Sequence, residues 1–127
     1  MSLKTIEPLR TIEQRRAQFA YGKIEDVKNS GNKNYKSLVR GFASTILLNG
    51  LGQALAFLKA KKKDHHLALY NHINLWAKKH FKKQDGFDIL NAIGEEASSS
   101  YRLYTKETLA FLVWLRKFAE AELPDKE

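Results

Sequence analysis

The sequence contains no cysteine and only two prolines. Without cysteine there is no disulfide, thiolate nucleophile or cysteine-ligated metal site, and this usage favours a reducing compartment. Pro8 and Pro124 leave the segment between them without the strongest helix breaker, where average usage of about 5% would place roughly six prolines. These absences exclude thiol chemistry and favour long helices.

Long apolar runs are also missing from the sequence. Every apolar run is far shorter than the ~20 residues that cross a bilayer, and the N-terminus lacks the apolar core of a signal peptide. We therefore expect a soluble, cytoplasmic protein that does not enter a membrane. A length of 127 residues fits one compact domain, predicted to span residues 1–127.

The net charge of +8 is unevenly distributed along the chain. Residues 1–84 carry a net +12, whereas residues 85–127 carry a net −4. Such segregation is typical of a protein with one surface that faces a polyanion.

Residue usage and apolar spacing predict an all-α fold. Leucine and alanine together number 30, against 15 valine, isoleucine and threonine residues, which favours helices over strands. Apolar residues recur at spacings of three and four, so we expect a compact bundle of about five to seven helices with no sheet. The expected helices span residues 5–30, 34–48, 51–61, 64–81 and 105–123, with a helical turn over 88–93 and a polar connector over 94–100.

Caps and buried faces follow from the same pattern. Asn34, Asp64 and Thr105 are the expected N-caps of the second, fourth and last long helices. Gly50 and Gly52 mark a kink or turn between the second and third helices. The last helix is apolar around much of its circumference and is expected to be the central strut of the core. Further expectations place Leu9 and Leu47 on buried stripes and make Phe57 and Tyr70 candidates for exposed partner contacts.

The four histidines do not have the spacing of a metal site. His65 and His72, or His72 and His80, lie two helical turns apart, about 11 Å, too far for two ligands of one ion. The sequence also lacks a nucleophile elbow, a phosphate-binding glycine-rich loop and a His-Glu-x-x-His motif. It therefore predicts no catalytic residue, metal or cofactor. A small metal-dependent nuclease that uses His65, His66 or His72 is a distant alternative.

Two lysine clusters close successive predicted helices. Together with basic residues of the first two helices, they give the candidate nucleic-acid-binding set: Arg15, Arg16, Lys36, Arg40, Lys59, Lys61, Lys62, Lys63, Lys78, Lys79, Lys82 and Lys83. The aromatic residues of these helices are mostly needed for the core, which favours weak, salt-dependent contact with phosphates over stacking on bases. In antiparallel helices the two clusters would lie at opposite ends. Alternatively, either cluster serves only solubility and the helix macrodipole.

The chain resembles the small, all-helical subunit of the Cmr-type (type III-B) CRISPR RNA-guided effector complex. Four stretches carry the resemblance. In the first helix they are Arg16-Ala17 and Ala20, and in the second Tyr35-x-x-Leu38-Val39. The middle stretch runs from Leu47 through Asn49-Gly50-Leu51 to Phe57, and the last is Tyr101-Arg102 followed by Thr105 to Ala121, which includes Trp114-Leu115-x-x-Phe118. It covers nearly the whole chain and is weakest over residues 84–100.

The resemblance implies a non-catalytic subunit that stacks with copies of itself and packs beside the repeated backbone subunit. It would flank the duplex of crRNA and target RNA in antiviral defence. The charge distribution adds the hypothesis that the acidic C-terminal third of one copy meets the basic surface of the next. The alternative is a free-standing helical protein that binds nucleic acids without sequence specificity.

Overall fold

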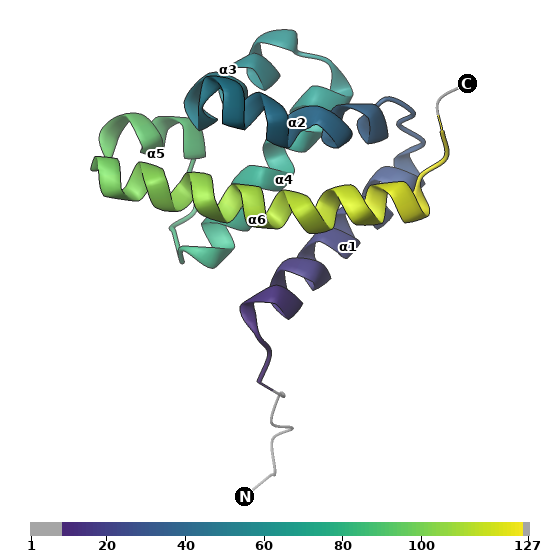
Figure 1. Ribbon diagram of the computed structural model, residues 1–127, viewed down its shortest axis with the longest axis horizontal. Helices are drawn as coiled ribbons and strands as arrows, with labels where there is room; N and C mark the ends of the chain where they lie inside the picture. The colour runs from purple at the N-terminus through teal and green to yellow at the C-terminus, as the bar shows by residue number, and fades with distance from the viewer. Residues whose placement is uncertain (1–8, 126–127) are drawn as a thin grey trace, which may run out of the picture.

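The computed structural model describes residues 9–125, which form six α-helices and no strand. The helices are α1 (Ile12–Ser30), α2 (Tyr35–Asn49), α3 (Leu51–Lys61), α4 (Asp64–His80), α5 (Ile89–Glu95) and α6 (Ser98–Glu122). The predicted all-α bundle is confirmed (Figure 1).

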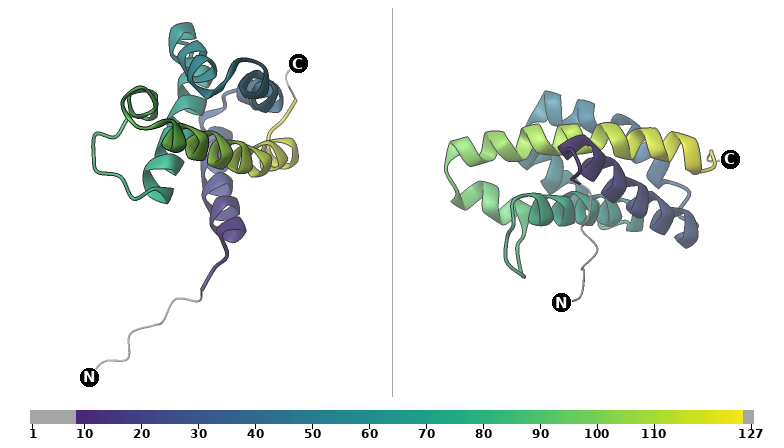
Figure 2. Two further views of the ribbon diagram at one scale, coloured as in Figure 1. Left: turned by 60° about the vertical axis from the view of Figure 1, so that its left-hand side comes forward. Right: turned by 90° about the horizontal axis from the view of Figure 1, so that it is seen from below.

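Helix α6 is the longest helix, and α1, α2, α4 and α5 all pack against it. Figure 1 shows α2 and α3 on one side of α6, and the view from below in Figure 2 shows α1 crossing it on the other. Phe111, Leu112 and Leu115 of α6 are buried in the single core cluster, to which every helix contributes. The prediction that the last helix is the central strut is confirmed.

Helix α1 begins at Ile12, later than the predicted start at residue 5, while residues 5–8 lie outside the described range. Thr11 and Gln14 form a capping box, in which the Thr11 hydroxyl accepts from the Gln14 N–H and the Gln14 side chain accepts from the Thr11 N–H. The Thr-x-x-Gln pattern was the available signal for this start. Leu9 precedes the helix and is fully exposed, so its predicted burial is wrong.

The start of α6 is the largest correction. It begins at Ser98, inside the predicted connector, and the predicted cap Thr105 lies within the helix, where its hydroxyl donates to the Tyr101 carbonyl. Tertiary contacts hold this first part of the helix. The Tyr101 hydroxyl accepts from the Gly52 N–H at 2.9 Å, and the Tyr104 hydroxyl donates to Glu96.

Two other predicted caps differ from the structure. Lys63, and not Asp64, occupies the N-cap position of α4. Asp64 lies in the first turn, where its negative charge interacts favourably with the helix dipole. Asn34 does occupy the N-cap position of α2, but its side chain makes no capping hydrogen bond.

Two further predictions are wrong, the burial of Leu47 and the exposure of Tyr70. Leu47 lies on the outer face of α2 and is 73% exposed. Tyr70 is buried, and its hydroxyl donates to Asp88, the side chain that caps α5.

The kink between α2 and α3 depends on two glycines. Gly50 has a φ of 88° and is both the C-cap of α2 and the N-cap of α3. At Gly52 a Cβ atom would lie 3.3 Å from Ile93 and 3.5 Å from the Tyr101 hydroxyl, so a side chain there would crowd the contact with α5 and α6. The predicted turn is confirmed, and the third helix has the predicted bounds.

Within residues 9–125, no helix is long and apolar enough to span a membrane.

His72 makes the stability of the fold depend on pH. It is buried, and its Nδ1 shares a hydrogen bond of 2.6 Å with the Tyr35 hydroxyl. Burial, with help from the charge of Lys23, lowers the pKa of His72 to about 4. Unfolding restores the ordinary value near 6.5. Between these values the unfolded chain binds more protons than the folded chain, so the free energy of unfolding falls as the pH falls through this window.

We expect His72 to account for a loss of about 3 kcal/mol in the free energy of unfolding between pH 7 and pH 4. The free energy of unfolding, measured with urea, should depend less on pH over this range in H72Q than in the wild type. The glutamine amide can still form a hydrogen bond with Tyr35. Equal pH dependence in the two proteins would contradict the assignment.

Candidate nucleic-acid interface

A basic groove runs between α1 and α4. Its main part has a volume of about 410 Å³, and an adjoining depression of about 310 Å³ shares Lys79 and Lys82 with it. Together the two parts are lined by Arg15, Phe19, Lys23, Leu75, Trp76, Lys78, Lys79, His80, Lys82 and Lys83. Arg15, Phe19 and Lys23 follow one another at four-residue spacing, so they lie along one face of α1.

The floor of the basic groove is aromatic and apolar. The Phe19 ring lies 5.4 Å from the Trp76 ring and packs against the core. Ammonium groups of Lys23 and Lys79 lie over the Phe19 ring, 5.1 and 5.4 Å from its centre. These cation–π contacts hold two positive charges at the groove.

Only part of this positive charge is neutralised within the protein. Lys78 pairs with Asp85 at 2.7 Å, and Lys83 pairs with Glu96 at 3.6 Å. In the described part of the chain, Arg15, Lys79 and Lys82 form no ion pair with a carboxylate. The groove therefore keeps an excess of cations that a row of phosphates can neutralise.

Lys82 occupies a backbone conformation that favours glycine. Helix α4 ends in a Schellman motif, in which the N–H of Lys83 donates to the Lys78 carbonyl and the N–H of Lys82 donates to the Lys79 carbonyl. Lys82 has a φ of 54°, in the left-handed region. Among residues 9–125, the other non-glycine residue with positive φ is Lys62, at the end of α3. A lysine thus stands in each cluster where glycine would be favoured by about 1 kcal/mol.

The second lysine cluster comprises Lys59, Lys61, Lys62 and Lys63, at the end of α3. It lies at the opposite end of α4 from the basic groove, about 25 Å away along a helix of this length. The two clusters therefore do not form one patch. Burial, followed by the charges of His65, Lys61 and Lys63, lowers the pKa of His66 beside this cluster.

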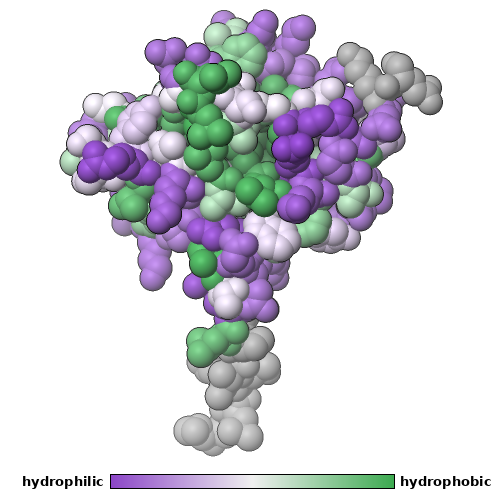
Figure 3. All heavy atoms as spheres, viewed as in Figure 1, coloured by the Kyte–Doolittle hydropathy of each residue, from purple (hydrophilic) through white to green (hydrophobic). Residues whose placement is uncertain are grey.

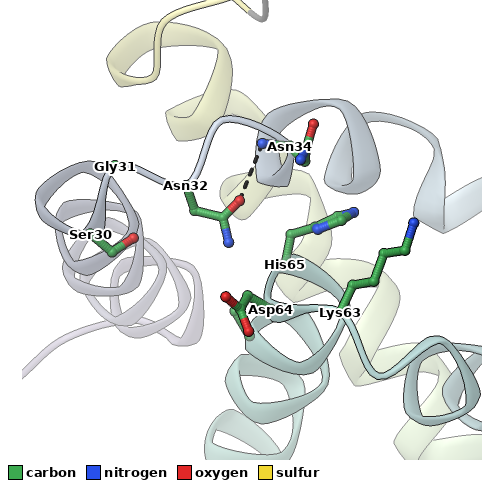
Figure 4. A pocket seen from close by; sticks show the side chains of 8 residues that line it. Ser30, Gly31, Asn32, Asn34, Lys63, Asp64 and His65 are labelled. Atoms are coloured by element: carbon green, nitrogen blue, oxygen red, sulfur yellow. Dashed lines mark hydrogen bonds between the residues drawn. The ribbon is translucent and has the colours of Figure 1, made fainter.

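A pocket of about 760 Å³ lies beside this second cluster. It is lined by Ser30, Gly31, Asn32, Asn34, Lys63, Asp64, His65 and Ala68. Figure 4 shows Asn32 and Asn34 from the α1–α2 turn close to Lys63, Asp64 and His65 at the start of α4. This pocket therefore combines a carboxylate, Asp64, with the cation Lys63, whereas only cations and neutral side chains line the basic groove.

Arg16 serves the fold and not the basic groove. Its guanidinium donates two hydrogen bonds of 2.7 Å to Glu107, which also accepts from the Trp76 indole at 2.9 Å. Burial by itself would raise the pKa of Glu107, but these hydrogen bonds and the charges of His80 and Arg16 lower it below its ordinary value. Glu107 is only 7% exposed.

Lys36 and Arg40 are also engaged within the chain. Lys36 is buried and donates to the Leu123 carbonyl at 3.0 Å and to Asp125 at 2.8 Å. Arg40 donates to Glu120 at 2.6 Å, across α2 and α6.

The folded chain does not keep the two signs of charge apart. Six acidic residues after position 84 pair with basic residues before it: Asp85 with Lys78, Glu96 with Lys83, Glu107 with Arg16, Glu120 with Arg40, Glu122 with Lys28, and Asp125 with Lys36. The uneven charge of the sequence therefore no longer supports the hypothesis that the acidic C-terminal third of one copy meets the basic surface of the next.

The histidines lie apart from a common site. His66 and His72 are buried, and His80 Nε2 lies 3.5 Å from Glu107 and stacks on Trp76. From Leu9 to Asp125, no three His, Asp or Glu side chains are grouped so that they could hold a metal ion.

These features define a small helical protein with a basic, aromatic-floored groove. The pattern of a family described as "CRISPR-associated protein (Cas_Cmr5)" matches residues 12–122, and the chain belongs to this family. The predicted family resemblance is thereby confirmed.

The relatives are similar over most of their length. A protein of Thermus thermophilus named "CRISPR system Cmr subunit Cmr5" is 32% identical over 114 residues, covering 89% of this chain and 96% of the relative. A Thermotoga maritima protein of the same name is 29% identical over 126 residues, covering 94% and 90%. The crystal structure of a CRISPR-associated Cmr5 family protein from Thermus thermophilus matches with a TM-score of 0.77 and 29% identity, covering 91% of this chain and all of that one.

Breaking the pair between Arg16 and Glu107 should destabilise the protein. We expect E107Q to lower the free energy of unfolding by about 3 kcal/mol, the low end for a broken buried pair, because Glu13 still neutralises Arg16. Urea unfolding measures the change, with E120Q as control. That variant breaks an exposed pair and should cost less than about 1 kcal/mol. Equal losses in the two variants would show that Glu107 has no special role.

Replacing Lys82 by glycine should stabilise the fold. K82G relieves the left-handed conformation and should raise the free energy of unfolding by about 1 kcal/mol. K82A is the matched control, since it removes the same charge but keeps the Cβ atom. A stability gain in K82A as large as that in K82G would trace the effect to charge and not to the backbone.

Proposed function

We propose that this protein is a non-catalytic small subunit of a Cmr-type (type III-B) CRISPR ribonucleoprotein. In this role it helps to assemble the filament and lines the channel that holds crRNA and target RNA. Its membership of the Cas_Cmr5 family and the names of its relatives support this proposal. Its partners are other Cmr subunits, including the repeated backbone subunit, and further copies of itself.

The observation that carries the RNA contact is the excess of positive charge in the basic groove. Lys79 and Lys82 are exposed at its centre, and Arg15 extends it along α1. Such a surface binds phosphates without regard to base sequence, and counterions are released from the phosphates as they bind. Each phosphate contact therefore adds to the salt dependence of binding. Arg16 and Lys36, which support the fold, are excluded from this role.

Contacts with neighbouring subunits require a different surface, because most of the acidic C-terminal side chains are paired within the chain. We assign these contacts to the exposed apolar side chains of α2 and α6. Leu47 and Leu48 of α2 are 73% and 83% exposed, and Val113 of α6 is 52% exposed. Figure 3 shows apolar surface over this side of the molecule, bordered by hydrophilic side chains.

The alternative is a free-standing, sequence-nonspecific nucleic-acid-binding protein. A non-specific basic surface typically binds with a Kd of ~10⁻⁴ to 10⁻⁶ M at physiological salt, so a subunit needs its partners to stay on RNA. Nanomolar RNA binding by the isolated chain would favour the alternative.

Removing charge from the basic groove should weaken RNA binding and its salt dependence. For the double variant K79A/K82A, we expect the slope of log K against log salt to fall by about 1.4 with single-stranded RNA, about 0.7 for each phosphate that the groove then leaves unneutralised. Fluorescence anisotropy of labelled RNA at several salt concentrations measures the slope.

The control is K106A/K117A, which removes two exposed lysines of α6 outside the groove. If this control reduces the slope as much as the groove variant does, RNA binding is a property of the net charge and the groove has no assigned role.

A further inference from the structure

A second groove lies at the kink between α2 and α3. It has a volume of about 400 Å³ and is lined by Thr45, Asn49, Gln53 and Phe57. These residues follow one another at four-residue spacing across the Gly50 kink, and Lys61 continues the series. One row thus combines a hydroxyl, two amides, an aromatic ring and a cation.

Phe57 is a large apolar side chain of α3 that is partly exposed. Leu51, Leu55 and Leu58 of the same helix are completely buried, whereas Phe57 is 39% exposed. One side of its ring packs edge to face on His66, with ring centres 5.5 Å apart, and the Lys61 ammonium lies 5.5 Å from its centre. The ring is therefore fixed in place and still accessible.

The amides of Asn49 and Gln53 have hydrogen-bonding capacity to spare. Within residues 9–125, neither side-chain amide forms a hydrogen bond, whereas the Thr45 hydroxyl donates to the Gly41 carbonyl. Each amide offers donors and an acceptor, the groups that pair with the edge of a nucleobase.

We propose that this groove binds one unpaired base of a single-stranded RNA. The base stacks on Phe57, its edge bonds to the amides of Asn49 and Gln53, and the flanking phosphates contact Lys61 and Lys62. Single-stranded RNA is recognised in general by such stacking on aromatic side chains with hydrogen bonds to the base edges. This inference rests on the proposed function, in which RNA is the ligand, and it revises the expectation that phosphate contact occurs without base contact.

The chemistry of the groove favours a base over an apolar side chain of a partner protein. An apolar side chain placed there would cover two amides without pairing them, which is unfavourable, whereas a base edge pairs them. The adjacent positive charge also fits RNA. Asp64 is the one acidic residue next to the cluster of Lys59, Lys61, Lys62 and Lys63 in the sequence. In a duplex the bases are already paired and stacked, so the groove selects single strands.

The test uses the full chain and a short single-stranded RNA that contains one 2-aminopurine. Loss of the stacking ring in F57L should lower the affinity for this RNA about 5-fold or more and reduce the quenching of 2-aminopurine. The affinity for duplex RNA and the salt slope should stay unchanged, because no phosphate contact is removed. F118L is the matched control, since Phe118 is a half-buried ring on α6, outside both grooves.

The outcomes separate this inference from the proposed function. If K79A/K82A weakens binding but F57L does not, the base site is wrong and the basic groove stands. If F57L weakens binding to single strands and duplex equally, or instead impairs binding to another Cmr subunit, the groove is not a base site. If the wild-type chain binds RNA no better than K79A/K82A, the basic groove is wrong. If the wild-type chain does not bind RNA at all, with or without its partners, both proposals are wrong.

Discussion

The contact between Arg16 and Glu107 fixes the arrangement from which the basic groove arises. Glu107 of α6 is nearly enclosed and accepts hydrogen bonds from Arg16 of α1 and Trp76 of α4, so one carboxylate joins three helices. A buried carboxylate is tolerated only with such partners. Because Arg16 points inward, Arg15 turns toward the groove, and Phe19 lies one turn further along α1 as its floor. The structural contact and the candidate RNA surface are therefore two faces of one helix crossing.

Pairing inside the fold decides where the positive charge remains. The acidic residues of the last third neutralise cations on α1, α2 and α4, including Lys28 and Arg40. In the described part of the chain, the excess gathers at the turns that end α3 and α4. There Lys62 and Lys82 hold left-handed conformations that glycine would adopt more easily.

Sequence reasoning predicted local features well and long-range ones poorly. The bounds of α3 were correct because Gly50 and the lysines that follow the helix mark its ends through local chemistry. The start of α6 was missed because three serines are typical of a connector. The contact that stabilises the first turns of α6, between Tyr101 and Gly52, joins residues 49 positions apart and is not visible as a local pattern. Phe57 was identified as an exposed candidate, but the groove around it required the kink to bring two helices together.

The sequence by itself determined the helical class, the glycine kink, the family and the two lysine clusters. These features depend on backbone propensity and near neighbours, which are written in the order of the residues. Only the tertiary structure decided which cations face solvent. Arg16 and Lys36 look like Arg15 and Lys79 in the sequence, but their partners Glu107 and Asp125 lie 91 and 89 positions away. An ion pair depends on distance in space, so folding alone separates the charges that hold the protein together from those left unpaired at the surface.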